Sequence, residues 1–247
     1  MSNPTTIAVI PARYAATRFP AKLMQRLGSK SVIRHTYDNT VATRLFDEVL
    51  VATDSEIIFN EITAHGGKAV MSQSQHESGS DRIAEAVAEM NVDIVVNVQG
   101  DEPFVQREPL EKLLQVFVGK AGENIHVASL MQLMKEPRFI NDPNYVKVAV
   151  DKDMNALFFS RSVIPFARNT EISVPYYEHI GVYAFTKQAL INFTNWRMTP
   201  LETAEKIECL RYLENGISIK MVLTEYMGVE IDTPEDLERA ARFLEHR

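Results

Sequence analysis

Short runs of consecutive apolar residues recur along the first half of the chain, each bounded by polar residues. Such a run predicts a strand that is buried on both faces, as in a parallel sheet. Between these runs, apolar residues recur at the spacing of amphipathic helices. The predicted strands are Ile7–Pro11, Val49–Ala52, Lys68–Met71 and Ile94–Val98. The predicted helices are Ser31–Thr43, Glu56–His65 and Asp81–Met90.

This alternation of strand and helix continues to about residue 118 and indicates βαβ units with a parallel, three-layer sheet. Beyond it the predicted strands are joined by longer connections, one of which is a polar, proline-containing loop at 135–145. No internal repeat or interdomain linker interrupts the chain, so we expect a single α/β domain. The later strands are Val127–Leu130, Val146–Val150, Leu157–Ser160, Ile180–Phe185 and Ile217–Thr224, and the later helices are Glu202–Glu214 and Pro234–Glu245.

Composition narrows the classes of partner. The chain has 247 residues, 45% of them hydrophobic, and a net charge of -7. An acidic balance argues against nucleic-acid or membrane-surface binding, because both require a basic face. The single cysteine, Cys209, forms no disulfide framework within the chain and is most simply a buried thiol. No apolar run approaches the ~20 residues of a membrane span, and no signal peptide is evident, so we expect a cytoplasmic protein.

Three polar segments follow predicted strands directly. They are the loop from Arg13 to Lys22, the pair Thr53-Asp54, and Gln99–Glu102. In an open α/β sheet, ligands bind beyond the carboxyl ends of the strands. These segments are therefore expected to meet at one binding edge.

The loop after the first strand carries Arg13, Arg18 and Lys22 but no glycine. Its cations suit a polyphosphate, although a solvated surface loop is the alternative. At the third edge segment, Gly100 would allow a ligand to approach the backbone closely. Asp101 there offers the hard oxygen ligand that Mg²⁺ prefers, or else belongs to an ordinary turn.

Two further segments admit both a functional and a structural interpretation. Ser78 and Gly79 precede a predicted helix, where main-chain N–H groups could hold a phosphate or base, or where Ser78 is simply an N-cap. Asp232 precedes the last helix and is either a second metal carboxylate or part of its cap. The chain lacks a dinucleotide-binding glycine motif, a complete P-loop, zinc-ligand spacing and a nucleophile motif.

Several segments, taken together and in order, resemble the 3-deoxy-D-manno-octulosonate (Kdo) cytidylyltransferases over essentially the whole chain. Each segment alone is weak evidence for this resemblance, whereas the set of segments in this order is specific to the family. The segments are IPARYAATRFPAK, VATD, HESGSDRIAEA, VVNVQGDEP, NYVKVAVD, FFSRSVIP, EHIGVYAF, TPLETAEKIECLRYLENG and GVEIDTPEDL.

The resemblance implies a Rossmann-like nucleotidyltransferase fold with a smaller β-rich part for sugar binding and dimerisation. It further implies one domain over residues 1–247, with a nucleotide-binding half at about 1–120 and a sugar-binding and dimer half at 121–247. The implied reaction transfers CMP from CTP to the anomeric hydroxyl of Kdo and releases pyrophosphate, with Mg²⁺ as cofactor, for lipopolysaccharide synthesis. A cytoplasmic homodimer that neither binds nucleic acid nor inserts into a membrane is expected.

The resemblance also assigns roles residue by residue. Catalysis is assigned to Lys22, Asp101 and Arg13, and the metal to Asp101 and Asp232. The nucleotide-binding set is Arg13, Lys22, Ser78, Gly79, Arg82 and Asp101. The sugar-binding set is Arg18, Gln99, His179, Tyr183 and Glu208, with Arg18 facing the carboxylate of the sugar acid.

The chain departs from the family pattern in the first loop, where Ala21 replaces a glycine and Leu23 a proline. Because alanine disfavours positive φ, we expect this loop to be reshaped. Two alternatives to the implied function remain open. One is a cytidylyltransferase for another sugar acid, such as 8-amino-Kdo or a sialic-acid-like sugar. The other is a non-catalytic nucleotide-binding protein of the same fold.

Overall fold

The computed structural model describes residues 4–15, 19–74, 76, 78–225 and 230–245, and the chain forms two compact units. Unit 1 consists of residues 1–111 and 227–247, and unit 2 of residues 112–226. The C-terminal helix α10 (Pro234–Glu245) therefore belongs with the N-terminal strands. The compact units thus differ at this end from the halves expected from the sequence, and the functional roles of those halves stay a prediction.

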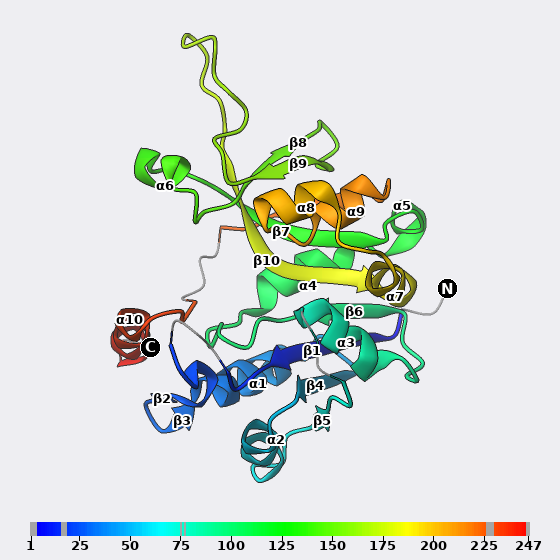
Figure 1. Cartoon of the computed structure of the whole chain (residues 1–247), viewed down its shortest axis with the longest axis vertical. Helices are drawn as coiled ribbons and strands as arrows, with labels where there is room; N and C mark the ends of the chain where they lie inside the picture. Colours follow the sequence, from blue (N-terminus) through cyan, green and yellow to red (C-terminus); the bar gives the residue numbers. More distant parts are fainter. Residues whose placement is uncertain (1–3, 16–18, 75, 77, 226–229, 246–247) are drawn as a thin grey trace. The chain divides into compact units, whose positions relative to one another are not determined.

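Parallel strands form the centre of unit 1, as the continuous apolar runs predicted. Strand β1 lies between β4 and β6, and β5 pairs with the far edge of β4 (Figure 1). Ala8 of β1 faces Val49 and Val96 in this register, and its side chain is fully buried. The strands are β1 (Thr6–Ala12), β4 (Glu48–Thr53), β5 (Ala69–Met71) and β6 (Ile94–Asn97).

Helices follow these strands in the order that the sequence predicted. Serine begins α1, α2 and α3, since the hydroxyls of Ser31, Ser55 and Ser78 each accept a hydrogen bond from a main-chain N–H of the first turn. The elements are α1 (Val32–Ala42), α2 (Glu56–Thr63) and α3 (Gly79–Val87), with a small hairpin of β2 (Arg26–Leu27) and β3 (Lys30–Ser31) before α1. Helix α4 (Arg107–Gln115) spans the boundary between the two units.

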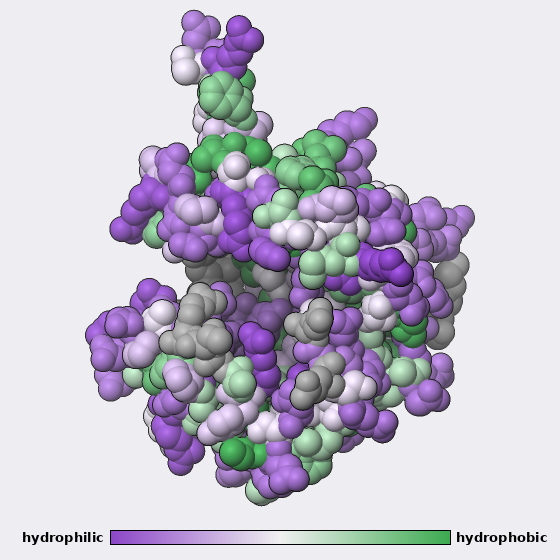
Figure 2. Space-filling view, in the orientation of Figure 1, coloured by the Kyte–Doolittle hydropathy of each residue, from purple (hydrophilic) through white to green (hydrophobic). Residues whose placement is uncertain are grey.

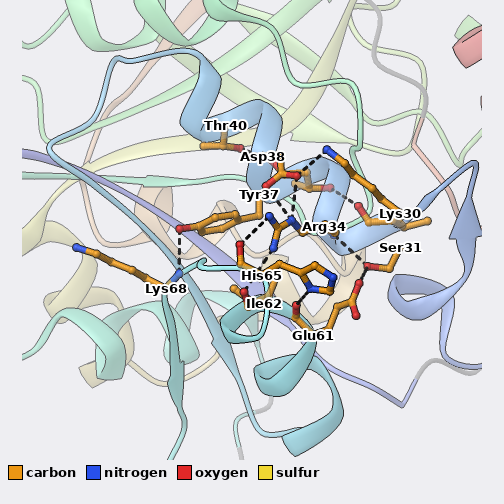
Figure 3. Close-up of polar contacts among 12 residues, drawn as sticks. Lys30, Ser31, Arg34, Tyr37, Asp38, Thr40, Glu61, Ile62, His65 and Lys68 are labelled. Carbon is orange, nitrogen blue, oxygen red and sulfur yellow. Dashed lines mark hydrogen bonds and ion pairs between the residues drawn. The ribbon is translucent and has the colours of Figure 1, made fainter.

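Arg34 of α1 binds the C-terminal end of α2 (Figure 3). Its guanidinium donates to the main-chain oxygens of Ile62 (3.5 Å) and His65 (3.0 Å) and pairs with Asp38. A cation at a helix C-terminus is favourable, because the last carbonyl groups carry partial negative charge. This contact fixes α1, the helix that follows the cationic loop, against the neighbouring helix.

Unit 2 is built around β7, which pairs antiparallel with β10 and parallel with β11. Strands β8 and β9 form an antiparallel pair that joins one end of β10. The connection from β9 to β10 extends away from these strands (Figure 1). The strands are β7 (Val127–Leu133), β8 (Lys147–Val150), β9 (Ala156–Ser160), β10 (Tyr177–Thr186) and β11 (Ile219–Leu223), and the helices are α5 (Gly119–Gly122), α6 (Pro137–Asn141), α7 (Lys187–Asn195), α8 (Pro200–Glu205) and α9 (Leu210–Glu214).

The single helix predicted over Glu202–Glu214 is wrong, because two helices occupy this segment. Helix α8 ends where Lys206 adopts left-handed angles (φ 56°, ψ 46°), and α9 starts at Leu210. Arg211 then turns back to Glu202 and forms a buried ion pair, with Nε 2.8 Å from Oε2. Helix α6 likewise interrupts the loop predicted at 135–145, and α7 was not predicted.

Hydrophilic residues cover much of the face shown in Figure 2. Among the exposed apolar side chains of unit 2 are Leu157, Phe166 and Ile172, of which Phe166 is 84% exposed. In the described residues no helix is both long and apolar enough to cross a membrane.

Candidate active site

The cationic loop after β1 leads into a short 3₁₀ helix, η1 (Lys22–Met24). Ala21 precedes it with φ 52° and ψ 32°, the left-handed region that usually requires glycine. The expectation that alanine reshapes the loop is therefore wrong at this residue, because Ala21 keeps the angles that suit a glycine. Leu23 is buried and anchors the turn. Arg18 lies outside the described residues.

Lys22 bridges two carboxylates from distant parts of unit 1. Its Nζ donates to Asp101 and to Oδ1 of Asp232, the latter at 2.7 Å. The three side chains are largely shielded from solvent, with exposures of 17%, 14% and 24%. Burial alone would lower the pKa of Lys22, but the two carboxylates raise it above its ordinary value, so the ammonium stays charged.

A backbone contact brings the C-terminal segment to this place. The N–H of Ile231 donates to the main-chain oxygen of Asp101 at 3.0 Å, and Ile231 is fully buried. Thr233, not Asp232, caps α10, since its hydroxyl accepts from the N–H of Asp236. The carboxylate of Asp232 is therefore available to Lys22, which excludes the alternative that Asp232 only caps the helix.

A third carboxylate, Glu230, joins the pair and was missed by the sequence analysis. Ligand atoms of Asp101, Glu230 and Asp232 all lie within 4.8 Å of one another. The signal in the sequence was the Glu-x-Asp spacing of 230–232, which places both side chains on the same side of an extended segment. Nearby, burial together with the charges of Asp101 and Glu230 raises the pKa of Glu102 to about 8.

Helix α1 holds the turn that carries Asp101. The hydroxyl of Thr36 donates to the main-chain oxygen of Gly100 at 2.9 Å, and Asn39 donates to that of Pro103. A Cβ at Gly100 would lie 3.2 Å from the oxygen of Pro11 and 3.3 Å from Leu23. The glycine therefore packs closely against Pro11 of β1 and Leu23 of η1, and its part in the approach of a ligand stays a prediction.

The segment expected to bind the nucleotide base starts α3. Ser78 acts as the N-cap, as the structural interpretation predicted, and its hydroxyl also donates to Asp81 (2.9 Å). Arg82 is 5% exposed, and its guanidinium donates to Ser72 (2.9 Å) and Asp54 (2.8 Å). Arg82 therefore fixes α3 against the ends of the neighbouring strands, and its nucleotide-binding role stays a prediction.

The remaining predicted residues of unit 1 lie at the same carboxyl edge of the sheet. Arg13 follows β1 and is exposed, whereas Gln99 follows β6 and is partly buried. Together with Lys22 and Asp101 they extend from strands that pair directly, because β1 lies next to β6.

The predicted sugar-binding residues of unit 2 lie on β10 and before α9. His179 packs edge-on against Phe159 and next to Tyr183, with ring centroids 4.9 Å and 5.3 Å apart. Burial lowers the pKa of His179 to about 4, so its imidazole is neutral near pH 7. The hydroxyl of Tyr183 bonds to Cys209, whose thiol has its pKa raised to about 12 by burial. Glu208 is exposed.

Comparison with known proteins identifies the family. A family model described as Cytidylyltransferase matches residues 7–220. The 3-deoxy-manno-octulosonate cytidylyltransferase of Flavobacterium johnsoniae is 60% identical over 238 residues, which cover 96% of this chain and 98% of that protein. The chain belongs to the 3-deoxy-manno-octulosonate cytidylyltransferase family. The relative from Christiangramia forsetii, of the same name, is 56% identical with 96% of each chain covered.

Solved structures agree with the family assignment. The structure of CMP:2-keto-3-deoxy-manno-octonic acid synthetase in complex with CTP matches with a TM-score of 0.92 and 34% identity, covering 98% of this chain and 99% of that one. This match confirms the Rossmann-like nucleotidyltransferase fold expected from the sequence. A 4-diphosphocytidyl-2C-methyl-D-erythritol synthase from Anaerococcus prevotii, at 17% identity and a TM-score of 0.65, shares the fold.

Proposed function

We propose that this protein transfers CMP from CTP to the anomeric hydroxyl of Kdo. The hydroxyl oxygen attacks the α-phosphorus, the bond to the β-phosphate breaks, and pyrophosphate leaves while the proton of the hydroxyl passes to Asp101. Family membership supports the reaction, and the observation that carries it is the contact of Lys22 with Asp101 and Asp232. In phosphoryl transfer between two oxygens, a cation can stabilise phosphate charge and paired carboxylates can hold a metal ion.

Asp101, Asp232 and Glu230 suit Mg²⁺ by their chemistry. Their carboxylate oxygens are hard ligands, their ligand atoms lie within 4.8 Å of one another, and two of them already hold a cation, the ammonium of Lys22. When bound, Mg²⁺ would neutralise phosphate charge and lower the pKa of the attacking hydroxyl. The role of Lys22 and Arg13 is to bind the triphosphate and stabilise the charge that develops on the leaving pyrophosphate.

Substrate recognition is assigned by the family resemblance. Ser78 and Gly79 present main-chain groups that can distinguish cytosine, with Arg82 fixing the start of α3 through Asp54. Kdo is assigned to Arg18, Gln99, His179, Tyr183 and Glu208. The neutral imidazole of His179 suits a sugar hydroxyl better than a carboxylate, since it brings no charge to the contact.

The deciding experiment measures pyrophosphate release with Mg²⁺, crossing four nucleoside triphosphates with Kdo, 8-amino-Kdo and N-acetylneuraminate. Turnover with CTP and Kdo is expected. Turnover with CTP and another sugar acid would keep the mechanism and change the substrate. Folded protein that binds CTP but turns over no combination would support a non-catalytic nucleotide-binding protein instead.

Cellular setting and assembly are part of the same proposal. A CTP-consuming enzyme of lipopolysaccharide synthesis would work in the cytoplasm, where CTP is made. We expect a homodimer formed through unit 2, whose exposed Leu157, Phe166 and Ile172 offer apolar area for a contact between copies. Light scattering coupled to gel filtration measures the mass, and a 28.0 kDa species at micromolar concentration would contradict the dimer.

A further inference from the structure

Ser129 of β7 has three polar neighbours around one hydroxyl. Its Oγ lies 3.1 Å from the main-chain oxygen of Ile180, 3.0 Å from that of Val182 and 3.0 Å from Nε2 of His179. The two carbonyl groups flank an irregularity in the pairing of β10 with β7, between Ile180 and Tyr183. Ser129 is fully buried, so these contacts decide how its hydroxyl is used.

The hydrogen-bond donors and acceptors around Ser129 indicate which nitrogen of the His179 ring carries the proton. A carbonyl oxygen only accepts, whereas a hydroxyl donates one proton and accepts through its oxygen. If Nε2 of His179 carries the proton, Ser129 donates to a carbonyl and accepts from Nε2–H, which makes two hydrogen bonds. If Nε2 is unprotonated, the single hydroxyl proton of Ser129 has three possible acceptors, namely Nε2 and the two carbonyl oxygens. None of these three groups can then donate a hydrogen bond to the buried oxygen of Ser129. The first arrangement is favoured.

With Nε2 of His179 bonded to Ser129, the other ring nitrogen, Nδ1, can bind a ligand. The main-chain N–H of His179 donates to Val146 O at 2.8 Å, and Phe159 and Tyr183 contact its ring. Within the described part of the chain, no hydrogen-bond partner contacts Nδ1. The ring is neutral near pH 7, because burial lowers its pKa to about 4, and Nδ1 then carries a lone pair.

We propose that Ser129 is a positioning residue that holds His179 in the tautomer protonated on Nε2, so that Nδ1 accepts a hydrogen bond from a hydroxyl of the sugar acid. This inference rests on the proposed function, which supplies the sugar. An Nδ1 acceptor cannot bind a carboxylate, because both would present lone pairs. Ser129 therefore makes His179 selective for the polyol part of the substrate.

Nitrogen-15 NMR of the free protein tests the tautomer without any turnover. The spectrum of ¹⁵N-histidine-labelled protein at pH 7 should show His179 with a protonated Nε2 and a bare Nδ1, and the His179→Asn spectrum identifies the signal. A protonated Nδ1 in the wild type would overturn the proposal whatever the kinetics show. Absence of turnover with Kdo in a protein of the expected tautomer would instead count against the proposed function.

Ser129→Ala then tests whether the serine sets the tautomer. The buried Nε2–H loses its acceptor, so the ratio of the tautomers should shift toward Nδ1–H by about tenfold or more. The KM for the sugar acid should rise by about tenfold, with the KM for CTP unchanged. Ser129→Thr, which keeps the hydroxyl, should restore both values if it folds.

Ser160→Ala is the matched control, because Ser160 is also a buried serine of unit 2 but donates to Glu205 at 2.6 Å. It should lose comparable stability and keep the tautomer of His179. A folded Ser129→Ala protein with the wild-type tautomer would overturn the role of Ser129. If neither variant at 129 folds, the wild-type spectrum still decides between the two tautomers.

Discussion

Replacing Ala21 with glycine should stabilise the protein. Ala21 holds left-handed angles, φ 52° and ψ 32°, at the entry to η1. Its main-chain oxygen accepts from the N–H of Met24 at 2.8 Å, so the turn that carries Lys22 depends on this conformation. In this region the Cβ of an L-residue crowds its own backbone, and a glycine does not.

Two opposing contributions set the magnitude. Left-handed angles cost a residue with a Cβ about 1–2 kcal/mol, which glycine would recover. Glycine also gains freedom in the unfolded chain, and this destabilises the folded state by about 0.4–1 kcal/mol. The net gain is about 0.5–1 kcal/mol, which corresponds to an increase in Tm of about 2 °C for a chain of this size.

Urea and thermal unfolding at pH 7 without ligands measure the effect. Ala241→Gly is the control, because Ala241 lies inside α10, where glycine should cost about 0.5–1 kcal/mol. Ala21→Val should lose stability as well, since a β-branched residue tolerates positive φ poorly. A loss in Ala21→Gly equal to that of Ala241→Gly would refute the argument from backbone strain.

Four further predictions concern charged and titratable groups. Lys22→Met should raise the affinity of the free protein for Mg²⁺ by about tenfold or more, measured by calorimetry, since it removes the cation between two carboxylates; an unchanged affinity would contradict this. Asp101→Asn should lower turnover by about a hundredfold with a nearly unchanged Tm, and near-normal turnover would exclude its metal role. Burial lowers the pKa of His179 to about 4, so the folded state binds this proton more weakly than the unfolded state does. The free energy of unfolding should therefore fall by about 2–3 kcal/mol as the pH drops from 6.5 to 4. Urea unfolding of His179→Gln over the same pH range should lack this loss. Arg211→Met should cost about 3–5 kcal/mol of unfolding free energy, because Glu202 is left as an unpaired buried carboxylate, and the double variant with Glu202→Leu should recover most of it.

The sequence predicted unit 1 better than unit 2, for a physical reason. Parallel strands such as β1 and β6 are buried on both faces and appear as uninterrupted apolar runs. The break between α8 and α9 lacks such a signal, because Lys206, and not a glycine, takes the left-handed position. The pair of Arg211 with Glu202 that accompanies the break is a tertiary contact, which helical periodicity cannot reveal.

The candidate site could be predicted only in part. Apolar runs and strand ends pointed to Lys22 and Asp101. The start of the last helix offered Asp232 with two alternative roles, and the resemblance favoured the metal role. Their contact depends on residues 210 positions apart, joined through the hydrogen bond of Ile231 to Asp101. The Glu-x-Asp spacing places Glu230 beside Asp232, but only the hydrogen bond of Ile231 to Asp101 brings it near Asp101.

Lys22 balances the charge of two carboxylates that the fold brings together. Carboxylates held this close repel one another, so the fold needs a cation among them, and Lys22 supplies it with a single flexible side chain. A nest of main-chain N–H groups could bind a phosphate, but it carries no full positive charge with which to neutralise carboxylates. Under the proposed function, Asp101, Glu230 and Asp232 would hold Mg²⁺, and Lys22 would bind the triphosphate. Metal binding and phosphate binding would then both involve Lys22, whose turn begins at the left-handed Ala21.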